Sequence, residues 1–232
     1  MTDTSDPHAP VGREPEPPAD SKLTRTKRDW ARQGKFLTGR LTRPEEQRLP
    51  PGQHLVRDWP VLDLGMQPRI SLDHWRLDVT GEVDHSVSWD WATFRAQKQT
   101  QETTDIHCVT TWSRYDNRWE GLATRDLLDL VMPREPARFV LLHSYDGYVT
   151  NLALEDFAAE DALIVHSWED KPLTIEHGGP ARLVVPHLYF WKSAKWLKKI
   201  EFAVADTRGF WEENGYHNHA DPWKEERYSD EE

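Results

Sequence analysis

The sequence predicts a mainly β, α+β fold formed by a single domain. Strand-like segments outnumber helical ones, and the stretches between them are rich in Gly, Pro and Asp. The clearest strand pattern covers 74–83, where Trp75, Leu77 and Val79 point to one face and polar residues to the other. Hydrophobic residues make up only 37% of the chain, but 12 Trp, 7 Phe and 6 Tyr supply enough apolar area for a core.

Two short helices are predicted after this first strand. Ser88 can cap a helix that runs to Phe94, and Thr124 can cap another whose aliphatic residues share one face before Pro133. The remaining predicted strands lie around 105–110 and over 138–144, 161–168, 181–186 and 199–205.

Composition divides the chain into three parts. Residues 1–50 are expected to form a disordered or extended arm, because 1–20 combine five prolines with five acids and 22–48 are strongly basic. Residues 51–216 are expected to form the domain. Residues 217–232 are expected to be an acidic, irregular C-terminal tail. The basic arm reads either as a solvated surface or as a docking segment for an acidic partner or nucleic acid.

Charge and hydropathy exclude several classes of protein. A net charge of −11 disfavours general nucleic-acid binding, which depends on clustered Lys and Arg. No run of apolar residues is long enough for a transmembrane segment, and the first residues lack the features of Sec and Tat signals. A cytoplasmic location is therefore expected. One cysteine allows neither an internal disulfide nor a metal site built only from Cys.

Cys108 is the first candidate for chemistry. It sits where a predicted strand enters a polar stretch that contains Thr110, Thr111, Ser113 and Arg114. By itself this position suits a small buried residue, a cysteine nucleophile or a metal-bound thiolate, and the spacing does not decide between them.

The segment 177–202 is the second candidate, because it is locally basic in an acidic chain. No acid falls between Arg182 and Lys199. Arg182 offers a planar fork suited to a phosphate, Lys195 a point charge, and the backbone around 193–195 further N–H donors. Gly178 and Gly179 allow a close approach of the backbone to a ligand. The alternative is a strand pair with a solvated basic rim.

Histidines are scattered without the spacing of a zinc motif. His217 and His219 could share a zinc ion, although alternating histidines in a tail more often meet solvent.

Taken together, four segments in this order resemble the sulfite oxidase-type molybdopterin-binding oxidoreductases. They are WRLDVTGEV (75–83), CVTTWS with RWEGL (108–122), SYDGYVTNLALED (144–156) and GGPARLVVP followed by WKSAKWLKKIEF (178–202). The resemblance covers roughly 58–216 and is closest to the bacterial group of the protein-methionine-sulfoxide reductase catalytic subunit.

The resemblance implies a role for each matching residue. Cys108 would be the thiolate ligand of molybdenum, beside the dithiolene of one molybdopterin. Arg182, Ser193, Ala194 and Lys195 would hold the cofactor's terminal phosphate. His177 replaces the asparagine that contacts the pterin in the reductase members, and Ser144 replaces a threonine.

Two further residues are catalytic candidates. Arg114 is the nearest arginine after the cysteine, where plant and animal members bind sulfite, although the surrounding motif differs from theirs. His217 could move a proton, since an imidazole titrates near about 6.5. Thr111, Ser113, Tyr115, Tyr216 and His219 could line the substrate funnel. The Asn-x-x-Tyr-Glu stretch of the reductase members is absent from 58–68.

The expected activity is therefore two-electron oxygen-atom transfer with a small sulfur-containing or sulfoxide substrate. No haem, flavin or iron–sulfur motif is visible, so a separate electron-transfer protein is expected as partner. Two alternatives stay open: a molybdopterin-binding protein without turnover, and a hydrolase that uses Cys108 as nucleophile.

Overall fold

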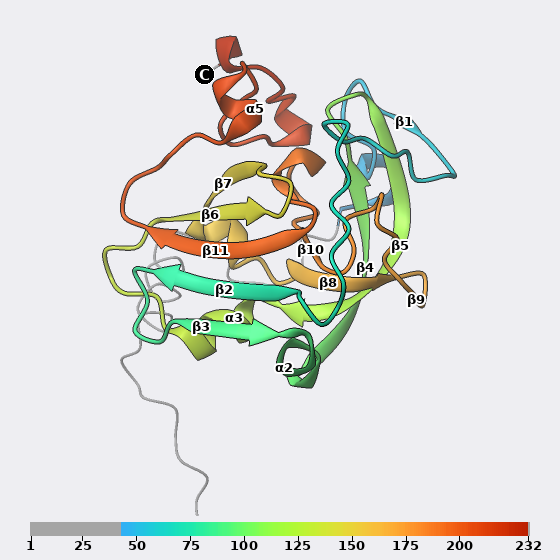
Figure 1. Cartoon of the computed structure of the whole chain (residues 1–232). Helices are drawn as coiled ribbons and strands as arrows, with labels where there is room; N and C mark the ends of the chain where they lie inside the picture. The colour runs from blue at the N-terminus through green and yellow to red at the C-terminus, as the bar shows by residue number, and fades with distance from the viewer. Residues whose placement is uncertain (1–42, 232) are drawn as a thin grey trace, which may run out of the picture. The chain divides into compact units, whose positions relative to one another are not determined.

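The computed structural model describes residues 43–231, which form two β-sheets accompanied by short helices (Figure 1). All described residues belong to one unit of dense contacts. None of the described helices is both long and apolar enough to cross a membrane.

The first sheet is organised around one long hairpin. Its six strands are β1 (His54–Leu55), β4 (Gln99–His107), β5 (Trp112–Ala123), β8 (Leu163–Trp168), β9 (Lys171–Pro172) and β10 (Arg182–Val184). β4 pairs along β5 in antiparallel register, from Gln99 opposite Leu122 to His107 opposite Ser113. The start of β5 pairs with β1 and its end with β8, which carries β10 on its other edge.

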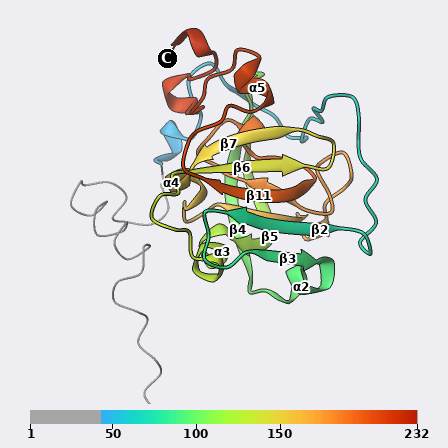
Figure 2. The ribbon, with the colours of Figure 1, turned by 60° about the vertical axis from the view of Figure 1, so that its left-hand side comes forward.

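The second sheet has five strands in the order β3-β2-β11-β6-β7, which Figure 2 shows one above the other. They are β2 (Arg76–Gly81), β3 (Val87–Asp90), β6 (Phe139–Ser144), β7 (Val149–Ala153) and β11 (Leu197–Ala203). The central strand β11 runs parallel to β2 and antiparallel to β6. β10 and β11 lie in different sheets but are joined by residues 185–196, so this connection links the two.

Helices are short and begin where strands end. They are α2 (Trp91–Ala96), α3 (Thr124–Val131), α4 (Leu154–Phe157) and α5 (Phe210–Glu213), with 3-10 turns η1 (Glu45–Gln47), η2 (Phe190–Lys192), η3 (Pro222–Lys224) and η4 (Ser229–Glu231). In α3 the residues Leu127, Leu128 and Val131 are buried on one face, as predicted.

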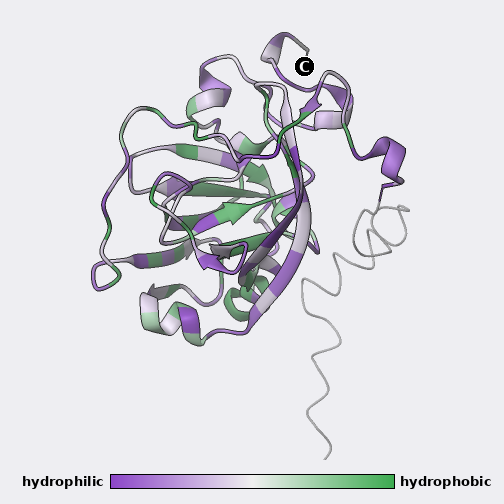
Figure 3. Ribbon diagram, turned by 90° about the vertical axis from the view of Figure 1, so that its right-hand side faces the viewer, coloured by the Kyte–Doolittle hydropathy of each residue, from purple (hydrophilic) through white to green (hydrophobic). Residues whose placement is uncertain are grey.

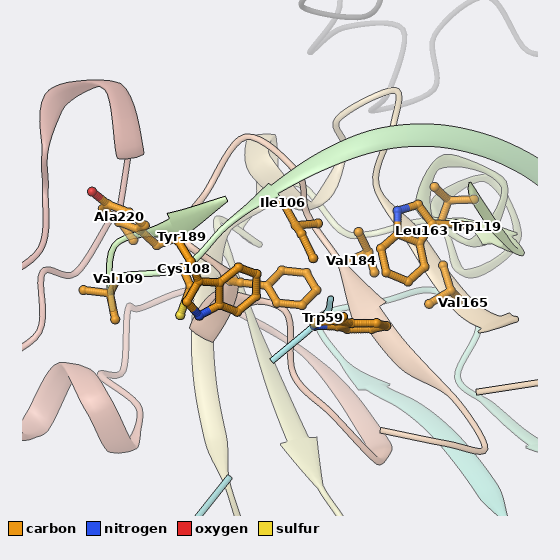
Figure 4. Packing of buried hydrophobic residues seen from close by; sticks show 12 residues of the cluster. Trp59, Ile106, Cys108, Val109, Trp119, Leu163, Val165, Val184, Tyr189 and Ala220 are labelled. Atoms are coloured by element: carbon orange, nitrogen blue, oxygen red, sulfur yellow. The ribbon is translucent and has the colours of Figure 1, made fainter. Parts of the chain in front are cut away.

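Hydrophobic side chains gather inside the domain, where Figure 3 shows most of the green ribbon. A cluster of buried residues packs against the first sheet and includes Trp59, Ile106, Trp119 and Val184 (Figure 4). The only cysteine is at one end of this cluster. Large aromatic side chains thus supply the buried area that the low aliphatic content does not.

The mainly β, α+β prediction is confirmed, with differences at the first helix and around the cysteine. Residues 87–90 are a strand, and the α2 helix is capped by Asp90, whose carboxylate accepts from the N–H of Thr93, instead of by Ser88. Thr124 opens α3 as its first residue, and its hydroxyl donates to the carbonyl of Ala162.

Both ends of the described chain contact the domain. Residues 1–42 of the predicted arm lie outside the described range. Arg48 reaches β4, where it binds the carboxylate of Asp105 at 2.7 Å. In the acidic C-terminal segment, Arg227 donates to the carbonyl of Val109 at 2.6 Å, and the indole of Trp223 donates to the carbonyl of Gln47.

A substitution at Gly121 tests the close approach of β5 and β8. A Cβ at this position would lie 2.1 Å from the carbonyl oxygen of Ile164. We expect Gly121→Ala to lower the free energy of unfolding by about 3 kcal/mol, because the backbone of β8 must move. Gly147→Ala is the matched control, since open space surrounds Gly147 and only its φ of +90° is unfavourable, which costs about 1 kcal/mol. Equal losses in urea denaturation would contradict this packing.

Candidate active site

Cys108 occupies the turn that closes the long hairpin. The N–H of Cys108 donates to the carbonyl of Trp112 at 2.8 Å, and the N–H of Thr111 donates to the carbonyl of Cys108 at 3.0 Å. Thr111 has a φ of 74°, in the left-handed region, so the chain reverses within four residues. A further buried contact, from the side-chain amide of Gln53 to the carbonyl of Cys108 at 3.1 Å, holds this turn from β1's side. The position of the sulfur is therefore fixed by backbone hydrogen bonds.

A β-bulge near this turn sets the direction of the hairpin's end. The register of β4 and β5 shifts between Thr104 and Ile106, and Asp116 on β5 has a φ of 55°. The N–H of Asp116 donates to the carboxylate of Asp105 at 3.0 Å and stabilises the irregular pairing. Bulges bend a strand and redirect its side chains, which is why they occur beside functional sites.

Burial controls the protonation of the cysteine. The residue is 7% exposed, and desolvation raises the pKa of its thiol. The hydroxyl of Thr110, 3.2 Å from Sγ, the nearby backbone N–H groups of Val109 and Thr110, and the charge of Arg227 act in the opposite direction but do not outweigh burial. In the protein alone Cys108 is thus a thiol, and a bound metal would supply the charge that makes it a thiolate.

Cys108 borders a cavity of about 330 Å³ that also contains the basic pair identified in the sequence. Arg182 enters it from β10, and Lys195 from the connection between η2 and β11. The loop at 59–64 and α5 close other sides. A large part of the wall is aromatic, formed by Trp59, Trp112, Tyr148, Phe190, Trp191, Trp196, Trp211 and Tyr216.

Arg182 is a buried cation whose partners are backbone carbonyls. It is 1% exposed and donates to the carbonyls of His177 at 3.0 Å and Ser193 at 2.6 Å. Lys195 donates to the carbonyls of Leu62 and Glu176, each at 2.6 Å. Within residues 43–231 neither cation forms an ion pair with a carboxylate.

Burial makes these charges unfavourable without an anion. Desolvation lowers the pKa of Arg182 to about 9 and, together with the charge of Arg182, lowers the pKa of Lys195 to about 8. An anion in the cavity would reverse both effects, because it would favour the charged forms.

Donors close to the two cations are free. The backbone N–H groups of Ala194 and Lys195 have no hydrogen-bond partner in the described part of the chain. The Ser193 hydroxyl accepts from the N–H of Val185 at 2.9 Å, which leaves its own proton available. Two further cavity residues, Ser144 and Trp112, have a buried polar atom without a partner in this structure. Free donors around one buried and one half-buried cation are what a site for an anion requires.

Some of the predicted site residues line this cavity, and others do not. Cys108, Ser144, Arg182, Ser193 and Lys195 all line this one cavity. Ala194 is buried behind it, where its carbonyl accepts from the N–H of Leu183. Among the proposed funnel residues, Tyr216 lines the cavity, whereas Thr111, Ser113, Tyr115 and His219 do not.

Two other predicted residues, His177 and Arg114, lie outside the cavity wall. His177 stacks on Trp59 with ring centroids 4.0 Å apart, and its backbone carbonyl holds Arg182. Arg114 donates to the carbonyl of Arg57 at 3.0 Å and lies over the ring of Trp168. Neither side chain is therefore part of the wall in which its predicted role would place it.

His217 is also outside the wall, although its neighbour Tyr216 lines it. Its Nδ1 accepts from the N–H groups of His219 at 3.0 Å and Ala220 at 3.2 Å, so its proton is on Nε2. The suggested zinc site has no support among residues 43–231, where no group of three or more metal-binding side chains occurs.

The glycines at 178 and 179 serve chain packing. A Cβ on Gly178 would lie 3.0 Å from the Cβ of Lys195, and one on Gly179 would lie 2.4 Å from the carbonyl oxygen of Leu173. The expected close approach is therefore to the protein's own segments, and at Gly178 it places Lys195 beside the cavity.

A buried ion pair behind the aromatic wall was not predicted. Nζ of Lys192 lies 2.7 Å from Oε1 of Glu212, and neither side chain is exposed. The same oxygen accepts from the hydroxyl of Thr150 at 2.8 Å and the indole of Trp191 at 3.0 Å. The pair thereby fixes α5 and Trp191 to β7. Sequence pattern could not reveal it, because the partners are brought together only by the tertiary fold.

Comparisons with known proteins found similar sequences and a similar fold. Residues 64–211 match the family model of the oxidoreductase molybdopterin binding domain. The chain is 44% identical over 191 residues to the uncharacterized oxidoreductase YuiH of Bacillus subtilis, covering 81% of this chain and 96% of that protein. It is 25% identical over 181 residues to the protein-methionine-sulfoxide reductase catalytic subunit MsrP of Campylobacter jejuni, covering 68% of this chain but 61% of the relative.

One solved structure shares the fold. The sulfane dehydrogenase SoxCD of Paracoccus pantotrophus superimposes with a TM-score of 0.55 at 16% sequence identity, over 60% of this chain and 40% of that chain. At this identity the similarity shows a common fold.

The buried pair Lys192–Glu212 should be essential for stability. We expect Lys192→Met to lower the free energy of unfolding by about 3–5 kcal/mol, because it leaves a buried carboxylate without a counter-charge. Lys199→Met is the control: its pair with Glu201 has the same 2.7 Å distance but is about one-third exposed, so it should cost less than about 1 kcal/mol. Chemical denaturation of both variants measures the difference, and equal losses would contradict the assignment.

His219 should make stability depend on pH. Its ring contacts Glu226 at 2.7 Å and Asp156 at 3.7 Å, and the interaction with Asp156 is the main cause that raises the pKa of His219 to about 9. A raised pKa contributes stability that is complete below the unfolded value of about 6.5 and is lost as pH rises through about 9.

Urea midpoints measured across this range test the prediction. Below pH 6.5 the wild-type protein should have a higher urea midpoint than His219→Gln, and this difference in midpoint should disappear above about pH 9. His85→Gln, at an exposed position, should show no such trend. A difference that stays constant with pH would mean that His219 acts by packing alone.

Proposed function

This chain belongs to the oxidoreductase molybdopterin binding domain family, and on that premise we propose that Cys108 ligates molybdenum in the cavity while Arg182 and Lys195 hold the phosphate of its pterin. The chain is an oxidoreductase, and its cofactor is molybdenum–molybdopterin. When bound, this cofactor supplies two-electron oxygen-atom transfer.

One observation carries the assignment of residues. The only cysteine borders the same cavity as the buried Arg182 and the half-buried Lys195, which pair with no carboxylate within residues 43–231. A soft thiolate suits a metal of high oxidation state. A phosphate suits the guanidinium of Arg182, the ammonium of Lys195 and the free N–H groups of Ala194 and Lys195. The donors present thus match both ends of the cofactor.

Other residues of the cavity complete the binding site in this proposal. Ser144 and Trp112 present buried polar atoms with no protein partner, and a pterin carries donors and acceptors that can satisfy them. The aromatic side chains exclude water from the reacting atoms, which strengthens every electrostatic contact inside the cavity. Tyr148 is fixed in this wall by donating to the carbonyl of Trp191 at 2.7 Å.

The proposed substrate is a small sulfur-containing or sulfoxide compound. The relatives named for their substrates include a protein-methionine-sulfoxide reductase and a sulfane dehydrogenase, which act on sulfur. Arg114, the candidate for an anionic substrate, has its guanidinium held by Arg57 and Trp168 outside the cavity wall. An uncharged substrate therefore fits the described wall better than sulfite does.

A cysteine hydrolase is less consistent with the geometry. Burial raises the pKa of Cys108, and the neighbouring His107 binds Ser113 and lies outside the cavity. Burial also lowers the pKa of His107 to about 4. We propose in addition a separate electron-transfer protein as partner, and the predicted cytoplasmic location stays a prediction.

Metal and pterin content of purified variants test the proposal. We expect equimolar molybdenum in the wild-type protein and, in Cys108→Ser, loss of sulfoxide reduction with a reduced viologen dye while bound pterin persists. Lys195→Met and Arg182→Met should lose pterin itself, because the phosphate loses its cations. Lys198→Met is the control, since its ammonium lies over the ring of Tyr145 and not in the cavity wall.

Two results would overturn the proposal. If wild-type protein purified from pterin-producing cells contains no molybdenum, the proposed binding of the cofactor in this cavity is contradicted. Cys108→Ser protein with unchanged sulfoxide reduction contradicts the ligand. Ester hydrolysis by metal-free protein that thiol alkylation abolishes would favour the hydrolase instead.

A further inference from the structure

A second cavity, of about 420 Å³, is lined by the residue that precedes Cys108. Its wall includes Asp105 and His107 of β4, Arg43 and Arg48 from the N-terminal end of the described chain, and Asp161. No residue lines both cavities. His107, the last residue of β4, lines this second cavity, whereas Cys108, in the turn that follows, lines the first.

His107 presents a hydrogen-bond acceptor to this second cavity. The side chain is 1% exposed, and its Nδ1 lies 2.8 Å from the hydroxyl of Ser113. The hydroxyl also donates to Oε1 of Gln53 at 3.3 Å, and with its proton there it accepts from Nδ1–H of His107. Nε2 therefore carries a lone pair, and it has no partner among the described residues.

The lining of the cavity carries more negative than positive charge, although Arg43 and Arg48 also act on His107. Four carboxylates and two arginines line the cavity. Arg48 is already bound by Glu45, Asp105 and Asp116. Arg43 lies over the ring of Trp223, 3.6 Å from its centroid.

Asp161 remains without a partner. Within residues 43–231 its carboxylate forms no ion pair or hydrogen bond. A metal ion is not favoured, because no group of three or more metal-binding side chains occurs there. An unpaired nitrogen acceptor and an unpaired carboxylate instead match a ligand that carries both positive charge and N–H donors.

We propose that the second cavity binds an organic cation with N–H donors, an amine or guanidinium that donates to Nε2 of His107 and pairs with Asp161. The ligand is either a free small molecule or an arginine or lysine side chain of a partner protein. Both sources supply the same chemistry.

A buried series of hydrogen bonds connects this site to the cysteine turn. It runs from His107 to Ser113, from Ser113 to Gln53 at 3.3 Å, and from the amide of Gln53 to the carbonyl of Cys108 at 3.1 Å. A ligand on His107 therefore acts on the backbone that positions the sulfur. This coupling rests on the proposed function, whereas binding of the cation does not.

Isothermal titration of the full chain with agmatine tests the binding. Agmatine should bind saturably, and tetramethylammonium, a cation without N–H donors, should not. Asp161→Asn and His107→Phe should each weaken binding by at least about tenfold, the effect of losing one charge-assisted hydrogen bond. Asp129→Asn and His85→Phe are controls at exposed positions. Asp161 is not part of the cysteine turn, so its variant keeps the test valid if His107→Phe fails to fold.

A peptide with a single arginine is the second arm of the titration. Tighter binding of the peptide than of agmatine identifies a partner's side chain as the source, and the reverse identifies a free ligand. Absence of saturable binding by both, or binding that Asp161→Asn and His107→Phe leave unchanged, overturns the site. In the holoenzyme, a change of the Mo(V) paramagnetic resonance spectrum on adding agmatine reports the coupling. If binding occurs without this change, the cation site stands and only its link to Cys108 fails.

Discussion

The tight turn between β4 and β5 is the constraint on which the rest of the site depends. Backbone hydrogen bonds within the turn, and a third from Gln53, fix Cys108 at the end of a hairpin whose strands are paired along their length. Because the turn is rigid, the sulfur borders the same cavity as two cations that come from the opposite part of the chain. A rigid ligand position is what a metal site requires, since binding need not first order the chain.

The two ends of this cavity differ in their electrostatics. The buried guanidinium of Arg182 has only carbonyl partners, and burial lowers its pKa to about 9, so an anion bound there gains most of what desolvation removed. At Cys108 the same burial raises the pKa of the thiol, and a bound metal reverses that effect. In the proposed function, one ligand that is anionic at one end and carries the metal at the other reverses both effects. The aromatic wall between them is held by the Lys192–Glu212 pair.

Regular alternation made much of the fold predictable, and irregular backbone concealed the rest. The strands β2 and β11 follow from alternation, and β6, β8 and β10 follow from short runs of apolar residues. β5 was not predicted, because its charged and polar residues and the bulge at Asp116 interrupt the pattern of its buried Trp112, Trp119 and Leu122. Cys108, Arg182 and Lys195 were candidates from the residues themselves, but only the resemblance implied their roles towards the cofactor, since neither Cys108 nor Arg182 has a spacing that distinguishes it. The free donors at Ser144 and Trp112 and the cation cavity beside His107 depend on contacts between distant segments, which no local pattern encodes.

X-ray absorption at the molybdenum edge tests the central claim most directly, because it counts the sulfur atoms bound to the metal. If Cys108 is a ligand, the wild-type protein should show one more sulfur in the metal's shell than Cys108→Ser, with molybdenum present in both. Identical sulfur shells in the two proteins would contradict the account, because the turn at the end of the hairpin would then have no part in binding the metal.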